Sequence, residues 1–348
     1  MAMTETRPAD GAAPAAPLPA DPPGLAGWLA TSDHKKVGRL LIGTSLLFLL
    51  ASAVIGIVLG AEGLDSGIDV VDDASMFGRL FTLQAEAAVL LFLVPFFLGL
   101  ATYLVPLQVG SPEIAFPRGS AAAYWGYLVG GGLLCASYAS DTATAVDLYL
   151  LSLVLIAISL ATGLVSAVTT VLTMRAPGMT LLRTPLFSWS VLAGGGLTLL
   201  TLPILAGRTI SVFAEHHFTG ELPADAFGQV AWIWTLPTVY ALVVMAAGVA
   251  LEVVPTLAKA PLRFHVAGIV VIGLLTVVGV GGWAFDPESL DDLLYVAIGL
   301  AAVLPALALL GLLGDTARGG SPSVKAPLVL AMASVLLLLA GAVVGALQ

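Results

Sequence analysis

Residues 80–118 of this chain read LFTLQAEAAVLLFLVPFFLGLATYLVPLQVGSPEIAFPR. Between Leu80 and Pro106 the stretch carries a single charged residue, Glu86. A run of about 20 apolar residues is long enough to cross the hydrocarbon core of a bilayer as an α-helix. The stretch therefore predicts a transmembrane helix. It also places a carboxyl group within the membrane, where an ionisable side chain is costly unless it faces protein or water.

Similar apolar runs fill the chain from residue 37 onward. Hydrophobic residues make up 59% of the 348 residues and charged residues only 10%, whereas a soluble domain is about 25% charged. The alternating pattern that a β-barrel requires is not visible. We therefore predict an all-α membrane protein, a bundle of nine transmembrane helices over roughly residues 37–60, 78–106, 121–140, 144–174, 186–210, 229–256, 264–284, 292–314 and 326–346.

The lysines and arginines fall on one side of the membrane if these nine spans alternate in direction; only Arg79 and Arg208 fall on the other. Basic residues next to spans are retained in the cytoplasm. We therefore predict a protein of the cell membrane with its N-terminus inside and its C-terminus outside. Residues 1–30, rich in Ala and Pro, are predicted to be a disordered cytoplasmic tail, and residues 31–348 the transmembrane domain.

The formal net charge of −9 comes largely from Asp and Glu in the predicted outer loops. An acidic outer face could steer a basic soluble partner to the membrane. It could equally be a by-product of keeping Lys and Arg inside, and both interpretations stay open. No basic cluster has the density that nucleic-acid binding needs, so we expect no nucleic-acid partner.

Several short motifs resemble subunit I of the haem–copper terminal oxidases, the cytochrome c oxidase family. They are TSDHKKVGR at 31–39, YLVPLQ at 103–108, AFPR at 115–118, YW at 124–125, PLFSWS at 185–190, LPTVY at 236–240 and WA at 283–284. The family writes HPEVY in its sixth span, where this chain has LPTVY. The resemblance implies a fold like the first nine spans of that subunit, and the family usually has twelve.

The chain departs from this family where the family binds its metals. Gln84 stands at the position of the low-spin haem histidine, and Leu236, Phe285 and Asp286 stand at the positions of the copper histidines. A neutral amide is a poor iron ligand, and copper prefers imidazole or thiolate. Haem and copper are cofactors of the family, but we expect this chain to bind neither, and we assign it no catalytic residue.

The resemblance therefore predicts a degenerate, redox-inactive component of a respiratory oxidase-type complex, with a structural or assembly role. Its expected partners are the lipid bilayer and other membrane subunits, for example a subunit II-like cupredoxin. One alternative is a subunit of a working oxidoreductase whose missing spans and ligands come from another chain. A second alternative is a proton or small-solute conduit centred on Glu86.

Two sets of polar residues are candidate sites. Gln84, Glu86 and Tyr240 are predicted to form a polar pocket, in which Glu86 either fills the space of the absent haem or takes part in proton movement. His216 and His217, expected in an outer loop, are weak metal candidates, because structural sites usually need three or four ligands. The alternative for the two histidines is an ordinary solvated loop.

Overall fold

The computed structural model describes residues 24, 26–62, 74–140, 142–219, 226–281 and 292–347. The chain divides into two units, residues 1–31 and residues 32–348. In the first unit a single helical turn, α1, covers Ala26–Leu29. The rest of the predicted tail, apart from residues 24 and 30, lies outside the described residues.

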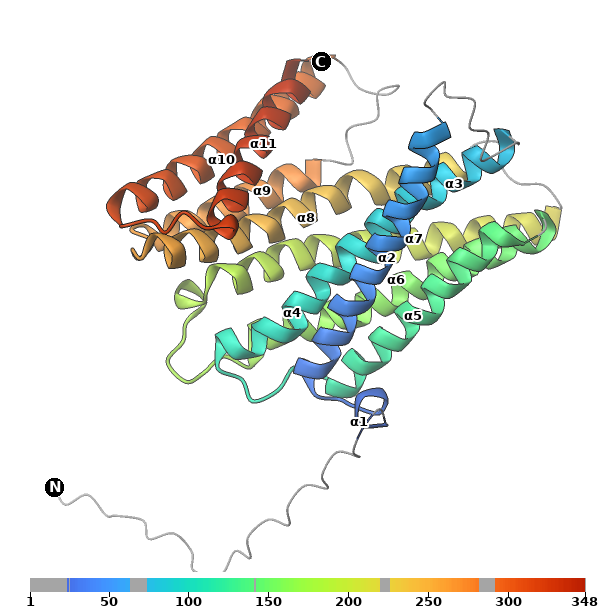
Figure 1. Ribbon diagram of the computed structural model, residues 1–348, viewed down its shortest axis with the longest axis horizontal. Coiled ribbons are helices and arrows are strands. Elements are labelled where there is room, and N and C mark those ends of the chain that lie inside the picture. The colour runs from blue at the N-terminus through green and yellow to red at the C-terminus, as the bar shows by residue number, and fades with distance from the viewer. Residues whose placement is uncertain are drawn as a thin grey trace, which may run out of the picture. The chain divides into compact units, whose positions relative to one another are not determined.

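The second unit is built from helices throughout its described residues (Figure 1). In chain order they are α2 (His34–Glu62), α3 (Ala74–Glu86), the π-helix η1 (Ala87–Leu93), α4 (Val94–Val109), α5 (Pro117–Ala139), α6 (Thr142–Thr173), the 3₁₀ turn η2 (Leu181–Arg183), α7 (Leu186–Thr219), α8 (Ala226–Ala258), α9 (His265–Gly281), α10 (Asp292–Gly319) and α11 (Ala326–Leu347). This confirms the prediction of an all-helical membrane protein.

Each predicted span coincides with a helical segment, but within the described residues only seven helices are long and apolar enough to cross a membrane. The two that fall short are α5 and α9. Polar and small residues, as in YWGYLVGGG at 124–132, lower the hydropathy of α5, and the described part of α9 covers only 17 residues. The predicted count of nine spans therefore stays a prediction.

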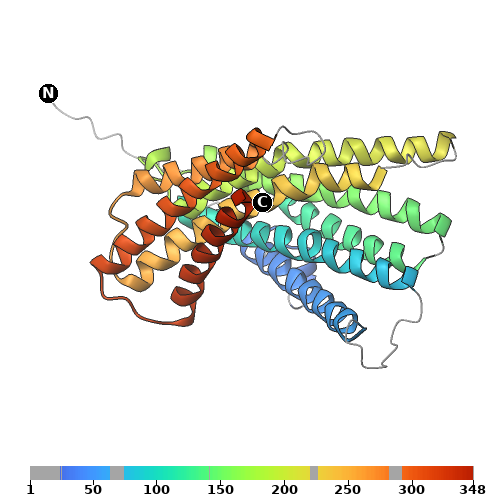
Figure 2. The same ribbon diagram turned by 90° about the horizontal axis from the view of Figure 1, so that it is seen from above.

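The helices of the second unit pack around two large groups of buried apolar side chains. One group lies between α2, η1 and the helices α4 to α8, and it includes Leu41, Leu91 and Tyr127. The other lies between α7 and the four helices that follow it, and it includes Val254 and Ile272. Figures 1 and 2 show α10 and α11 lying beside α8 and α9, with α5 and α6 side by side in the other part of the bundle.

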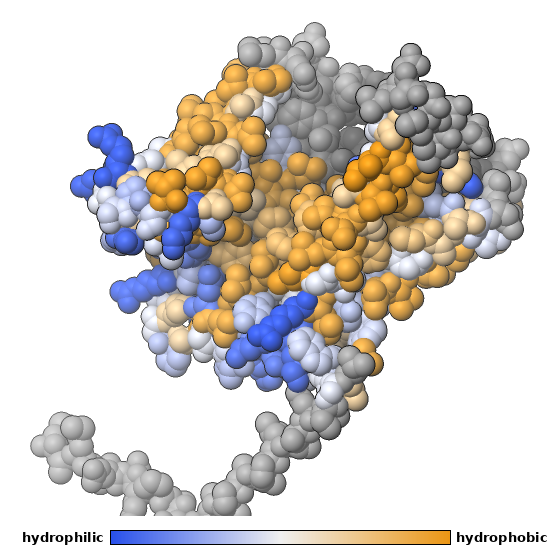
Figure 3. Space-filling model, viewed as in Figure 1, coloured by the Kyte–Doolittle hydropathy of each residue, from blue (hydrophilic) through white to orange (hydrophobic). Residues whose placement is uncertain are grey.

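One end of the bundle carries most of the basic residues, and we call it the basic end. Backbone hydrogen bonds connect its loops: Ala176 N donates to Val109 O over 2.8 Å, and Ser321 N donates to Ala258 O over 2.9 Å. The first bond joins the ends of α4 and α6, and the second joins the ends of α8 and α10. The basic residues at this end are Lys35, Lys36, Arg39, Arg118, Arg175, Arg183, Lys259, Arg263, Arg318 and Lys325. Figure 3 shows hydrophilic side chains along this edge and a hydrophobic surface over the helices.

The π-helix η1 has a cause that can be read from the sequence. Proline has no backbone N–H, so Pro95 cannot donate to the carbonyl of Leu91, four residues earlier, as an α-helix requires. In the structure the hydroxyl of Tyr127 donates to Leu91 O over 2.6 Å. A side chain of α5 thus satisfies a carbonyl that the proline leaves free, and the wider π-turn directly after Glu86 absorbs the change of register.

Candidate functional site: the Glu86 cluster

The carboxyl group of Glu86 is bound by two tyrosines from two other helices. Tyr149 Oη donates to Glu86 Oε1 over 2.6 Å, and Tyr138 Oη donates to Glu86 Oε2 over 2.9 Å. Glu86 is half-buried and is the last residue of α3 before the π-helix begins. We call these three residues the Glu86 cluster.

The tyrosines are positioned by the hairpin that α5 and α6 form. Tyr138 lies in the last turn of α5, and Tyr149 lies two turns into α6. Their rings meet edge to face, with centroids 6.3 Å apart and an interplanar angle of 84°. Because each carboxyl oxygen accepts one hydroxyl, the cluster connects α3 to both α5 and α6. The cluster is therefore a group of hydrogen-bonded polar side chains that joins three helices within an apolar bundle.

Gln84 faces a different neighbour, α2. Ser52 Oγ donates to the backbone carbonyl of Gln84 over 3.1 Å. A Cβ placed on Gly56 would lie only 3.2 Å from Gln84 Nε2, so the amide lies directly over this glycine. Two residues along an α-helix differ by about 200° in direction, which explains why Gln84 and Glu86 contact different helices.

Tyr240, the third member of the predicted polar pocket, lies on α8. A Cβ placed on Gly279 of α9 would lie 2.9 Å from the Cβ of Tyr240. The structure therefore places Gln84 against α2, Glu86 against α5 and α6, and Tyr240 against α9. The tyrosines that meet Glu86 are Tyr138 and Tyr149, which the sequence analysis did not single out.

All four histidines of the chain lie at helix ends. His34 begins α2 and His265 begins α9, both at the basic end. His216 and His217 lie in the last turn of α7, so the prediction that they belong to a loop was wrong: α7 continues to Thr219. An amphipathic last turn can project beyond the hydrocarbon core without losing its backbone hydrogen bonds, and hydropathy alone therefore ended the helix too early.

His217 has an ionisable neighbour on the adjacent helix. Its Nε2 lies 3.2 Å from Asp147 Oδ1 of α6, and its ring packs edge to face on Phe213 with centroids 4.3 Å apart. Across the ranges that the structure describes, no three His, Cys, Asp or Glu residues lie close enough together to hold a metal ion. The pair His216 and His217 thus stays a weak metal candidate.

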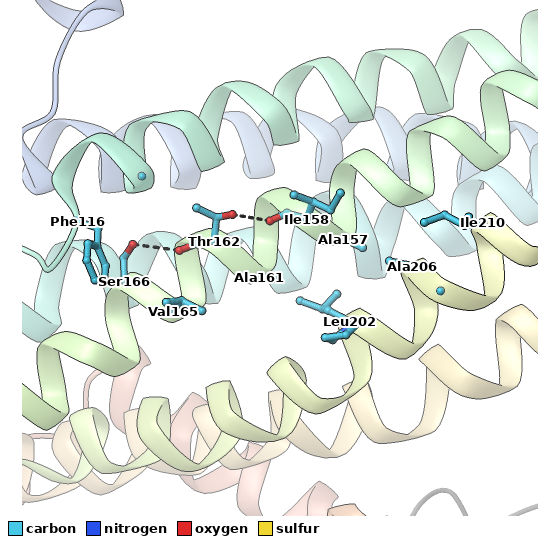
Figure 4. A pocket seen from close by; sticks show the side chains of 13 residues that line it. Phe116, Ala157, Ile158, Ala161, Thr162, Val165, Ser166, Leu202, Ala206 and Ile210 are labelled. Atoms are coloured by element: carbon cyan, nitrogen blue, oxygen red, sulfur yellow. Dashed lines mark hydrogen bonds between the residues drawn. The ribbon is translucent and has the colours of Figure 1, made fainter.

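A cavity of about 770 Å³ lies between α6 and α7, with Phe116 at one end (Figure 4). The two hydroxyls that line it bond to their own helix: Thr162 Oγ1 donates to Ile158 O over 2.8 Å, and Ser166 Oγ donates to Thr162 O over 3.0 Å. Apolar side chains such as Val165 and Leu202 form most of the remaining wall. The cavity therefore offers an occupant apolar contacts, which suit a hydrocarbon chain.

The sequence profile of the family described as cytochrome c and quinol oxidase polypeptide I matches residues 36–348. The chain belongs to this family. A Streptomyces avermitilis protein described as a cytochrome c oxidase subunit 1-beta is 32% identical over 300 residues, covering 78% of this chain and 53% of the relative. Cytochrome c oxidase subunit 1 of Corynebacterium glutamicum is 28% identical over 271 residues, covering 70% of this chain and 46% of the relative.

The chain is thus a cytochrome c oxidase subunit I-like, multi-pass protein of the plasma membrane, in a family whose members are parts of multi-subunit oxidase complexes. It spans about half the length of the curated relatives that it matches.

Members of the cytochrome c and quinol oxidase polypeptide I family normally bind haem and copper. Of the positions where the resemblance places their ligands, the structure describes the side chain of Gln84 and, for Leu236, only the backbone within α8. Phe285 and Asp286 lie outside the described residues. Every imidazole of the chain is described, and none lies at these positions.

One further polar contact was missed by the sequence analysis. Glu252 lies near the end of α8, and its Oε1 accepts the backbone N–H of Phe187, in the first turn of α7, over 3.3 Å. The N–H groups in the first turn of a helix have no partner within that helix. A carboxyl group at the same depth on a neighbouring helix could therefore have predicted this hydrogen bond.

Proposed function

We propose that this chain is a redox-inactive member of its family that acts as a structural or assembly component of a respiratory oxidase-type membrane complex. The observation that carries the proposal is the position of Gln84. The resemblance places the low-spin haem ligand there, and the chain has an amide that packs over Gly56 of α2. An amide is a poor ligand for haem iron, which takes an imidazole, thiolate, thioether or phenolate.

The donor set of the chain supports the same proposal. Haem and copper held within a helical bundle need imidazole or sulfur ligands that point inward from the spans. His34 and His265 begin their helices, and His216 and His217 lie in the last turn of α7. The four imidazoles do not fit a buried haem or copper centre, and we derive no redox step through either group.

The Glu86 cluster supports a structural role. A carboxyl group that accepts hydroxyls from two helices stabilises one arrangement of three helices over others. A structural subunit of a membrane complex depends on a fixed arrangement of its helices, because its partners bind to that surface. We therefore propose that the cluster fixes the position of α3 on the α5–α6 hairpin.

The conduit alternative is less well supported by the surroundings of Glu86. A proton path needs polar side chains or water in sequence across the membrane. From the cluster toward the basic end, the described interior between η1, α4, α5 and α6 includes the apolar residues Leu91, Leu98 and Leu160, and the buried hydroxyls of Tyr127, Ser152 and Ser159 donate to backbone carbonyls. A path through Glu86 would have to cross this layer.

The test is the absorption spectrum and copper content of the full chain, purified together with the membrane subunits that accompany it. We expect no haem Soret or alpha band and no copper that scales with this chain. A stoichiometric haem that remains when the partner subunits are removed would overturn the proposal. Haem that is present only with the partners would favour the alternative in which another chain supplies the ligands.

A further inference from the structure

A second cavity, of about 540 Å³, opens at the basic end of the bundle. One wall is the connection between α8 and α9, which contributes Pro261 and Arg263. The other wall is the end of α10, which contributes Asp315 and Arg318. Segments about 50 residues apart in the sequence thus bring two arginines, Arg263 and Arg318, to one hollow.

The two walls are held together by backbone contacts. Ser321 N donates to Ala258 O and Ser323 N donates to Leu257 O, each over 2.9 Å. A Cβ on Gly320 would overlap Ala258 O, so only glycine permits this close approach of the α10–α11 connection to the end of α8. The hollow is therefore part of the packed structure of this end rather than a gap between independent loops.

The cavity has an excess of positive charge. Arg263 and Arg318 are both exposed, and within the described part of the chain neither is ion-paired. Of the residues that line the cavity, Asp315 is the acidic one. Lys259 precedes the first lining residue along the chain and adds a further exposed cation to the same end.

Apolar residues next to the cavity place it at the boundary between water and hydrocarbon. Phe264, directly before α9, is 56% exposed, and Val266, in the first turn of α9, is 57% exposed. The guanidinium of Arg263 lies 5.6 Å from the centre of the Phe264 ring, a pairing of cation and aromatic side chain that suits the membrane interface. Figure 3 shows hydrophilic side chains at this edge directly beside the hydrophobic surface.

We propose that this cavity binds the phosphate group of an anionic phospholipid, with the acyl chains lying over Phe264 and Val266. A guanidinium donates two parallel hydrogen bonds to a phosphate, and basic pockets between transmembrane helices at the cytoplasmic surface suit anionic head groups. A free phosphate offers the same head-group chemistry but would leave the adjacent apolar surface unused. The proposal does not depend on whether the chain is redox-inactive.

The experiment titrates phosphatidylglycerol into the delipidated full chain in detergent and counts bound lipids by native mass spectrometry. Phosphatidylcholine provides the zwitterionic comparison. The test variant is Arg263→Gln with Arg318→Gln. The matched control is Arg118→Gln with Arg183→Gln, which removes two exposed arginines from the same end of the bundle but outside the cavity.

Each arginine near a membrane surface contributes about fivefold to binding, so the test variant, which lacks two, should bind phosphatidylglycerol about 25-fold more weakly. The control should bind like the unaltered chain, and Asp315→Asn should bind at least as tightly. Equal losses in both double variants would overturn the proposal, because they would indicate general surface charge.

Displacement of the lipid by millimolar inorganic phosphate would overturn the assignment to a lipid. If the test variant does not elute as a folded protein in size-exclusion chromatography, Asp315→Asn still tests the proposal. Weaker binding of phosphatidylglycerol by Asp315→Asn would contradict it.

Discussion

Replacing Glu86 with leucine removes the acceptor that two tyrosine hydroxyls share. In the unaltered chain the hydroxyls of Tyr149 and Tyr138 lie 2.6 Å and 2.9 Å from the two carboxyl oxygens. Leucine is apolar and accepts no hydrogen bond, so both hydroxyls lose the carboxyl acceptor. Replacement with glutamine keeps the shape and one carbonyl oxygen, and it serves as the conservative comparison.

The expected loss follows from the number of contacts. A buried hydroxyl left without a partner costs about 1–3 kcal/mol, whereas single hydrogen bonds between membrane helices contribute about 0.6 kcal/mol on average. Because Glu86 is only half-buried, the lower part of the range applies to each hydroxyl. We expect about 2 kcal/mol for Glu86→Leu and less than about 1 kcal/mol for Glu86→Gln.

The tyrosines allow a double-mutant cycle. Tyr149→Phe and Tyr138→Phe each remove one hydroxyl and leave the ring packing in place, so each should cost about 1 kcal/mol. In the background of Glu86→Leu, the same tyrosine substitutions should cost less, because the hydrogen bond is already lost. A coupling of about 1 kcal/mol between positions 86 and 149 is the expected sign of a direct contact.

The assay is equilibrium unfolding in mixed micelles of increasing SDS content, followed by far-ultraviolet circular dichroism. The matched control is Glu113→Leu, which removes an exposed carboxyl group from the loop after α4 and should change stability by less than about 0.5 kcal/mol. If Glu86→Leu unfolds at the same SDS content as Glu113→Leu, the cluster does not stabilise the bundle and the argument for a structural role fails.

Two further predictions use the same assay. Tyr127→Phe removes the donor to Leu91 O and should cost about 1 kcal/mol; an unchanged unfolding midpoint would mean that water replaces the hydroxyl. Glu252→Ala removes the acceptor for the first-turn N–H of Phe187 and should cost about 1 kcal/mol, as loss of a helix cap does. Glu252→Gln, which retains an acceptor oxygen, should lose less, and equal losses in the two variants would contradict the capping role.

The helices could be predicted from the sequence because the length and apolar composition of one segment decide whether that segment can cross the bilayer as a helix. Each predicted span coincides with a described helical segment. Helix ends were less predictable: α7 continues through Glu215 and His216 to Thr219, because backbone hydrogen bonding does not stop where hydropathy falls. The same limit applies to α5, which forms a full helix although its composition is less apolar than that of its neighbours.

The Glu86 cluster could be predicted only in part. An intramembrane carboxyl group requires polar neighbours, and this singled out Glu86. The identity of the neighbours depends on helix rotation, which a sequence does not fix. Gln84 and Glu86 are two positions apart but contact different helices, and the π-helix that follows them changes the register of the remaining span.

The two ends of the bundle are stabilised by different kinds of contact. At the basic end the loops are joined by backbone hydrogen bonds, as between Ala176 and Val109, which most side-chain substitutions leave intact. Near the opposite end of α5, the hydrogen bonds that join α3 to α5 and α6 come from one carboxyl group and two hydroxyls. Such a contact is needed there because α3 directly precedes the π-helix, where the regular α-helical hydrogen bonds are interrupted. The packing of the helices therefore accounts for the half-buried position of Glu86.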